Sequence, residues 1–242
     1  MNEMIRQLFN RKSVRVFEER PVTAEDKALI LEAACMAPTA GNRQLYTIID
    51  VTDQAIKEQL VDTCDHQPFI AKAQMVLIFC ADCRKWYEGF KATDSEPRKP
   101  GVGDLMIAVS DATIAAQNAV TAAESLGIGS CYIGDIMENA EQQRSLLHLP
   151  EYVFPAAMLV FGYPTRQQQE RKKPNRVAMK HIVHENAYRC MNEEEMQEMW
   201  SPAAGEKGYP AWMQAFCSRK YNAGFSRERN RSVAAYLKQF EK

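Results

Sequence analysis

The chain has 242 residues, of which 46% are hydrophobic and 25% charged, and its net charge is −1 at pH 7. This composition is typical of a soluble globular protein with a sizeable core, and it gives no electrostatic reason to expect nucleic acid or an anionic membrane as a partner. No apolar run approaches the roughly 20 residues of a membrane span, and the N-terminus lacks the apolar segment of a secretory signal. Seven cysteines, an odd number, indicate reduced thiols, so we expect a cytoplasmic protein.

The first motif in chain order is a short basic segment, Arg11-Lys12-Ser13-Val14-Arg15. Alternate side chains of an extended segment share a face, so Arg11, Ser13 and Arg15 would point one way while Val14 and Val16 turn inward. Such a face suits an anionic ligand, because arginine binds phosphate or carboxylate oxygens in pairs. The alternative is a solvated basic turn, which is the favoured interpretation for the motif in isolation.

Helical and strand patterns alternate after this motif. Thr23 is a typical helix N-cap, and the alanine- and leucine-rich segment 24–36 that follows it ends before Pro38. Apolar and β-branched runs predict strands at 46–51, 75–80, 128–133 and 157–163. The alternation has no strict βαβ rhythm, which favours an α+β fold over a doubly wound sheet.

Other segments have different compositions. Residues 85–103 are charged and contain two prolines, which predicts a mobile excursion. Residues 104–126 are rich in alanine and nearly free of charge over their second half, which predicts a long central helix. Residues 167–176 form a polar, basic loop, and helical sequence with a basic tail follows from about 190. We find no repeat and no linker, so we expect 1–242 to be a single domain with an excursion and a C-terminal extension.

Four further segments carry groups that suit a ligand. They are the helix-end turn 37–44, the amide and ring of Gln67-Pro68-Phe69, the strand and glycine turn 127–135, and the two cations of Lys173-Pro-Asn-Arg176. Backbone N–H groups at a glycine turn can approach a ligand closely, and an amide offers both donors and an acceptor. Each segment alone is more often structural.

Together these segments resemble the nitroreductase family of FMN-dependent oxidoreductases, in order along nearly the whole chain. Four further stretches belong to the same ordered set: Phe79-Cys-Ala-Asp82, Ala115-Ala-Gln-Asn118, Leu159-Val-Phe-Gly-Tyr-Pro164 and Ile182-Val-His-Glu-Asn186. The resemblance implies an α+β, nitroreductase-like fold: a central, mostly antiparallel sheet flanked by helices, with a long central helix. It also implies an intertwined homodimer with two FMN sites at the subunit interface.

The resemblance further implies which residues bind FMN: Arg11, Lys12, Ser13, Arg15, Pro38, Thr39, Ala40, Asn42, Gln67, Phe69, Tyr132, Ile133, Gly134, Asp135, Lys173 and Arg176. The phosphate and ribityl chain would contact Arg11, Lys12, Ser13, Lys173 and Arg176. Arg15 and Gln67 would address the pyrimidine edge of the ring, and the backbone N–H groups of Gly134 and Asp135 would face N5 and O4. Residues 38–42 would come from the other subunit. Asp135 is a departure, since many relatives have glycine or glutamate there.

The implied activity is NAD(P)H-dependent reduction of nitroaromatics, quinones or similar electron-poor small molecules, with NADPH favoured. Hydride transfer to a flavin needs stacking and orientation rather than a protein nucleophile, so we expect a ping-pong, two-electron cycle without a catalytic side chain. Arg15 would stabilise the negative charge of the reduced flavin. Two alternatives stay open: a flavin reductase that supplies reduced FMN, and a non-catalytic FMN-binding or storage protein.

Three other features have simpler interpretations. Cys80 and Cys83 form a C-x-x-C pair, but they lie at the end of a buried strand without the helix start that a redox dithiol needs. His181 and His184 lack further residues at ligand-like spacing, so we expect no metal site. The basic tail is interpreted as a solvated, dimer-wrapping segment; the alternative is that Arg229 and Arg231 bind the 2′-phosphate of NADPH.

Overall fold

The computed structural model describes residues 1–241 of the chain. Its internal contacts group the chain into two compact units, the first formed by 1–171 with the segment from 228 onward, and the second by 172–227. The single-domain organisation stays a prediction.

The first unit is built on a sheet of four antiparallel strands in the order β1-β2-β4-β3. The strands are β1 (Tyr46–Asp50), β2 (Met75–Asp82), β3 (Gly129–Ile133) and β4 (Val153–Gly162). Every residue of β2 and β4 is buried, because these are the two inner strands and helices cover both faces of the sheet. The predicted antiparallel sheet and all four of its strands are confirmed.

The helices of the first unit are α1 (Glu3–Asn10), α2 (Ala24–Cys35), α3 (Gln54–Thr63), α4 (Phe69–Lys72), α5 (Arg84–Lys91), α6 (Val102–Ser125), α7 (Ala140–Leu146) and α8 (Arg166–Glu170). α11 (Gly224–Leu237) belongs to it over most of its length. Thr23 caps α2 as predicted, its side chain accepting a hydrogen bond of 3.0 Å from the backbone N–H of Asp26. The long central helix is confirmed as α6, and Gly127 follows it with a φ of 73°.

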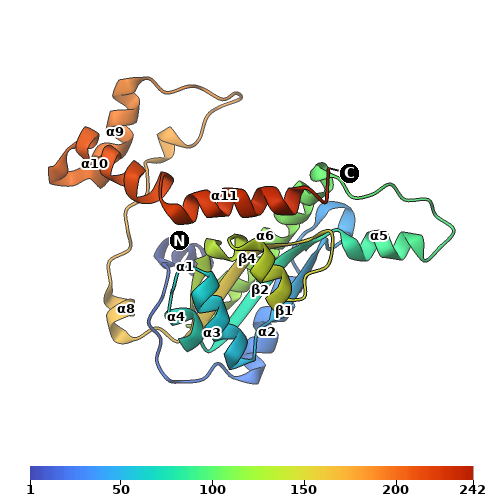
Figure 1. Ribbon diagram of the computed structural model, residues 1–242. Coiled ribbons are helices and arrows are strands. Elements are labelled where there is room, and N and C mark those ends of the chain that lie inside the picture. Colours follow the sequence, from blue (N-terminus) through green and yellow to red (C-terminus); the bar gives the residue numbers. More distant parts are fainter. Residues whose placement is uncertain (242) are drawn as a thin grey trace. The chain divides into compact units, whose positions relative to one another are not determined.

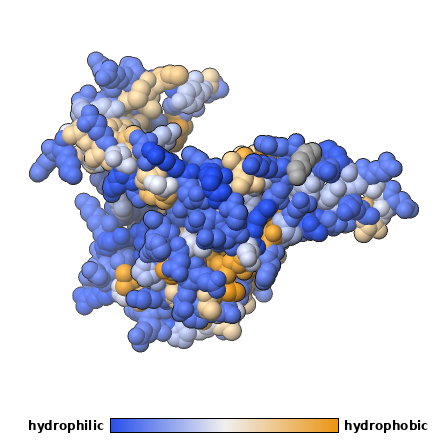
Figure 2. Space-filling view, in the orientation of Figure 1, coloured by the Kyte–Doolittle hydropathy of each residue, from blue (hydrophilic) through white to orange (hydrophobic). Residues whose placement is uncertain are grey.

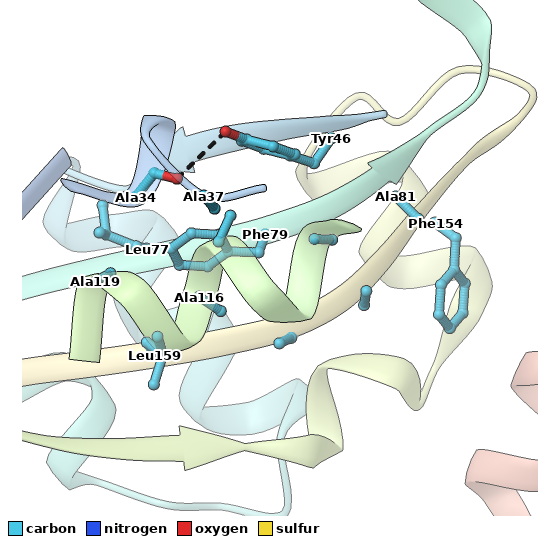
Figure 3. Close-up of a cluster of buried hydrophobic side chains, with 14 of the residues drawn as sticks. Ala34, Ala37, Tyr46, Leu77, Phe79, Ala81, Ala116, Ala119, Phe154 and Leu159 are labelled. Atoms are coloured by element: carbon cyan, nitrogen blue, oxygen red, sulfur yellow. Dashed lines mark hydrogen bonds between the residues drawn. The ribbon is translucent and has the colours of Figure 1, made fainter. Parts of the chain in front are cut away.

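One face of the sheet packs against α6, and α6 packs in turn against α2 (Figure 1). The alanines of α6 that face the sheet are fully buried, so its backbone lies close to Leu77, Phe79 and Leu159 (Figure 3). Each of these fully buried side chains contributes about 1.5–3 kcal/mol to stability. The hydroxyl of Tyr46 donates to the backbone oxygen of Ala34 (3.3 Å), which links β1 to the end of α2.

The opposite face of the sheet supports a second hydrophobic cluster. Leu60 of α3 and Ile70 of α4 pack there against Ile78 of β2 and Val160 of β4. Cys131 and Ile133 of β3 belong to the same cluster. The strand β3 is thus held from this side. The basic segment that contains Ser13 lies along the free edge of β3.

Two segments that we predicted to be irregular contain helices. The excursion 85–103 begins inside α5, because the buried carboxylate of Asp82 accepts hydrogen bonds from the backbone N–H groups of Arg84 (3.0 Å) and Lys85 (3.1 Å). Only the stretch 92–101, between α5 and α6, lies outside helices. The loop 167–176 likewise starts within α8.

The second unit contains α9 (Glu193–Ala204) and α10 (Tyr209–Phe216), followed by one π-helical turn, η5 (Cys217–Tyr221). Asn192 and Glu195 form a capping box at the start of α9. The rings of Trp200, Trp212 and Phe216 are stacked, with centroids 6.0 and 5.1 Å apart.

The surface of the described residues is mostly hydrophilic on the face drawn in Figure 2, where hydrophobic side chains form small groups. Within residues 1–241, no helix combines the length and the apolar composition that crossing a membrane would require.

Candidate functional site

The basic N-terminal segment lies along the free edge of β3. Ser13 forms a parallel bridge with Ser130, and the N–H of Val14 donates to the Ser130 oxygen at 2.9 Å. The buried side chain of Val14 packs on Gly129, where an added Cβ would lie only 2.6 Å from Val14 Cγ2. Only glycine therefore allows this approach. Val14 turns inward as predicted, whereas Val16 is 49% exposed, because the extended segment does not continue along β3 as far as Val16.

A second set of contacts ties the same segment to the chain beyond β4. The Lys12 ammonium donates to the backbone oxygens of Gln169 (2.5 Å) and Arg171 (2.6 Å), where its charge also complements the C-terminal end of α8. The Arg171 guanidinium donates in turn to the Ser13 oxygen at 2.5 Å. These three bonds fix the backbone from which Arg11, Ser13 and Arg15 project.

Two guanidinium groups of the basic segment contact aromatic rings near β3. Arg11 donates to the hydroxyl of Ser130 (3.4 Å) and lies 5.9 Å from the centre of the Tyr132 ring, and Arg15 lies at the same distance from the Phe69 ring. Burial raises the pKa of Tyr132 to about 12, partly opposed by Arg11. Burial also raises the pKa of the Cys131 thiol, and Arg15 is the largest opposing influence.

Arg11 carries the clearest sign of an incomplete site. Its Nε is buried, and no hydrogen-bond acceptor reaches it within residues 1–241. A buried donor without an acceptor costs about 1–3 kcal/mol. An oxygen of an anionic ligand placed against this guanidinium would satisfy Nε and neutralise the charge.

The amide of Gln67 has a fixed direction. Its nitrogen donates to the Asp135 carboxylate (2.6 Å) and to the backbone oxygen of Cys64 (2.9 Å). Both amide protons are therefore used, and Gln67 can offer a ligand only its carbonyl oxygen. Asp65 and His66, both with positive φ, form the turn that places Gln67.

The glycine turn follows β3 directly as the 3₁₀ helix η2 (Gly134–Met137). The side chain of Ile133 is buried in the core, so only its backbone can face a ligand. Gly134 has open space beside it, since an added Cβ would meet nothing closer than the Arg229 guanidinium at 3.9 Å. The turn is closed by a hydrogen bond of 2.9 Å from the Glu138 N–H to the Asp135 oxygen.

A separate loop around η1 (Ala40–Asn42) is attached to α6. It contains the predicted ligand residues Pro38, Thr39, Ala40 and Asn42. The buried carboxylate of Asp111 accepts from the N–H groups of Ala40 (3.0 Å) and Leu45 (3.2 Å). A cavity of about 340 Å³ lies between this loop and the exposed side of α6, with Ile107 and Ile114 in its wall.

The remaining predicted ligand residues belong to the second unit. Lys173 is half-buried and Arg176 exposed there. Their role in the site stays a prediction.

The structure bears on the other features as well. Burial raises the pKa values of Cys80 and Cys83 to about 12, which disfavours a redox dithiol. No group of three or more potential metal ligands occurs in the described part of the chain. Arg231 is held by Glu141 (2.7 Å) and Glu228 (2.8 Å), which supports a structural role for this part of the tail.

Three residues near the site escaped the sequence analysis: Ser130, Arg171 and Glu138. The alternation of strand side chains could have identified Ser130, which shares a face with Tyr132. Arg171 and Glu138 gave no comparable signal, because their positions depend on contacts with distant segments.

Comparisons with known proteins show what this chain is similar to. The sequence model of the Nitroreductase family matches residues 8–163. An FMN reductase of Bacillus subtilis that uses NAD(P)H is 31% identical over 245 residues, covering 99% of this chain and 92% of that protein. An oxygen-insensitive NADPH nitroreductase of Salmonella typhimurium is 35% identical over 194 residues, covering 80% of this chain and 78% of that protein. The solved NADPH:FMN oxidoreductase of Vibrio harveyi, complexed with NAD+, has a TM-score of 0.84 at 26% identity, covering 99% of both chains.

Proposed function

Because the chain belongs to the nitroreductase family, we propose that the residues gathered along β3 hold FMN and that electron-poor small molecules are reduced there. The chain is an FMN-dependent oxidoreductase that uses NAD(P)H. Bound FMN supplies two-electron hydride chemistry, for which the protein provides binding, orientation and charge rather than a nucleophile.

The observation that carries the assignment of the site is the buried Nε of Arg11, which lacks an acceptor, in a segment that also carries the guanidinium of Arg15. FMN is anionic at its phosphate, and reduction adds negative charge to the ring. Arg11 would therefore bind the phosphate end with Ser13, and Arg15 would stabilise the charge on the reduced ring. Lys12 supports the site by fixing the backbone, since its ammonium already binds two carbonyl oxygens.

The direction of the Gln67 amide fits a ring N–H. Its carbonyl oxygen is the group left for a ligand, so it would accept a hydrogen bond from the pyrimidine part of the flavin. The backbone N–H groups of Gly134 and Asp135 would lie nearer the reacting edge of the ring. Lys173 and Arg176 would add cations at the phosphate.

We propose further that the chain forms a homodimer. α1 packs against α6, and together they expose apolar side chains: Met4 is 62% exposed, Met106 60% and Ile114 40%. The loop 38–42 borders the same surface across the cavity beside α6. A second copy covering this surface would bury these side chains and bring the loop to the partner's flavin. The seven free cysteines support a cytoplasmic location.

The test of the proposed reaction is the visible spectrum of the purified protein with FMN. Anaerobic NADPH should bleach the flavin absorbance, and addition of a nitroaromatic or quinone should restore it. If NADPH leaves the flavin absorbance unchanged, the chain is a binding or storage protein instead.

A second candidate is a flavin reductase that releases reduced FMN, because relatives carry that name. Steady-state kinetics distinguish the two activities. A nitroreductase should show a higher kcat/KM for nitroaromatics or quinones than for free flavin as acceptor, whereas a flavin reductase should show the reverse order.

A further inference from the structure

A cavity of about 420 Å³ lies in the first unit, apart from the site described above. It is bordered by α5, by the segment 92–101 that turns back alongside α5 before α6 begins (Figure 1), and by Arg43 and Leu45 ahead of β1. None of the residues that line it belongs to the set predicted to bind FMN. Its volume lies in the range of cavities that bind small molecules, so it is a separate candidate for a ligand site.

Three aromatic rings of α5 form one wall of the cavity. The ring centroids of Trp86 and Phe90 lie 5.5 Å apart, and Tyr87 packs edge-on against Tyr152 at 5.6 Å. Trp86 is nevertheless 38% exposed and Phe90 44%. The indole N–H of Trp86 donates to the backbone oxygen of Arg43 at 2.6 Å, which fixes the direction of the ring. A flat ligand ring would stack against these fixed, uncovered rings.

A second wall, formed by the segment 95–100, is held in place by polar contacts. Arg98 binds the carboxylate of Asp104, at the start of α6, through two hydrogen bonds of 2.5 and 3.0 Å. Asp104 also accepts from the backbone N–H of Gly101 at 2.9 Å. The charges of Arg98 and Asp104 therefore neutralise each other, and the pair leaves no net charge for a ligand.

Arg43 is the cation of the lining that remains available. Its Nε donates to the Ala40 oxygen at 3.1 Å, but its two terminal nitrogens make no hydrogen bond with the described residues. Glu96 also lines the cavity, but its side chain is exposed, so solvent screens its charge. A guanidinium whose two terminal nitrogens are unused can bind a carboxylate through two parallel hydrogen bonds.

We propose that this cavity is a second binding site, for a small planar aromatic molecule that carries a carboxylate. The ring stacks against Trp86 and Phe90, and the carboxylate binds the terminal nitrogens of Arg43. The buried side chains of Leu45 and Cys83 form the apolar base of the site. No flavin is needed for this binding, so the proposal goes beyond the proposed function and stands without it.

Calorimetric titration of the natural chain, with and without FMN, tests which chemistry the cavity takes. Naphthoate has the ring and the carboxylate, naphthylmethanol only the ring, and acetate only the carboxylate. We expect naphthoate to bind more tightly than the other two probes in both forms of the protein. If naphthoate binds no more tightly than naphthylmethanol, the proposal is wrong. Loss of naphthoate binding when FMN is added would place the probe in the flavin site and also overturn it.

Variants assign the binding to the cavity. Arg43→Gln should raise the Kd for naphthoate by about tenfold and leave that for naphthylmethanol within about twofold. Arg84→Gln is the matched control, because Arg84 lies in the same helix but lines a different cavity, and it should change neither Kd. Phe90→Ala should raise the Kd of both ring probes by about three- to tenfold. A loss of naphthoate binding in Arg43→Gln that is no greater than the loss of naphthylmethanol binding contradicts the role of Arg43.

The indole N–H of Trp86 reports where the probe lies. The chain has three tryptophans, so its nitrogen–proton spectrum contains three indole signals, and the signal that is absent in Trp86→Phe belongs to Trp86. Naphthoate should shift this signal more than those of Trp200 and Trp212. Naphthoate that binds without shifting the Trp86 signal lies elsewhere on the protein, which would overturn the proposal. Failure to bind FMN would refute the proposed function, and the titrations without flavin would still decide on this site.

Discussion

Replacement of Gly129 by alanine tests how the basic segment is held beside β3. The new Cβ would lie 2.6 Å from Val14 Cγ2 and 2.9 Å from Val14 Cβ, whereas ordinary contact begins at 3.4 Å. Valine is stiff at χ1, so Val14 cannot turn aside and the segment must move by about 0.8 Å.

The expected cost follows from this displacement. Overpacking of a buried site costs about 1–3 kcal/mol, and for a chain of this size each kcal/mol lowers Tm by about 2–4 °C. The shift also stretches the Arg11–Ser130 hydrogen bond, which is already 3.4 Å long. We therefore expect Tm to fall by about 2–12 °C and the Kd for FMN to rise about tenfold, the equivalent of 1.4 kcal/mol.

Thermal unfolding of the flavin-free protein and fluorescence titration with FMN measure both effects. Gly89→Ala is the matched control, because Gly89 lies in α5 and its added Cβ would meet nothing within 4 Å. That change should stabilise the chain by about 0.5–1 kcal/mol. The double variant Gly129→Ala/Val14→Ala should recover part of the lost affinity. If Gly129→Ala binds FMN as tightly as the natural chain, the packing of Val14 does not position the site.

Three other predictions follow from individual contacts. Asp111→Ala should lower the free energy of unfolding in urea by about 2–5 kcal/mol, because two backbone N–H groups lose their buried acceptor. Asp111→Asn keeps one acceptor oxygen and should lose less stability. Equal losses of stability in the two variants would contradict this reasoning. Thr23→Ala should cost about 1 kcal/mol by thermal circular dichroism, through loss of the α2 cap, whereas an equally unstable Thr23→Ser would exclude the cap as the cause. At pH 8 a thiol reagent should rapidly modify at most the exposed Cys35, Cys190 and Cys217 in the native protein, and rapid reaction of a fourth thiol would contradict the burial of the others.

The sheet and the central helix were predictable because their signals are local. The apolar, β-branched runs of the four strands and the alanines of α6 face a core, so composition alone indicated their burial. The helix α5 was missed because the group that receives its first N–H bonds, Asp82, belongs to the preceding strand. Its Trp86 also donates to the backbone oxygen of Arg43 (2.6 Å), a contact that no local pattern indicates.

The candidate site was predictable to the extent that it lies in short motifs. The alternation of side chains along an extended segment predicted that Arg11 and Ser13 share a face. The glycine turn predicted an accessible backbone at Gly134. The burial of Glu138 was not predictable, because its ion-pair partner Arg229 belongs to α11, far along the sequence.

A crystal structure of the protein with FMN tests the central claim most directly. We predict the flavin phosphate against the Arg11 guanidinium with an oxygen on Nε, the pyrimidine edge between Arg15 and the Gln67 carbonyl oxygen, and the reacting edge at the Gly134 turn. A flavin bound elsewhere, with Arg11 Nε still lacking an acceptor, would contradict the account.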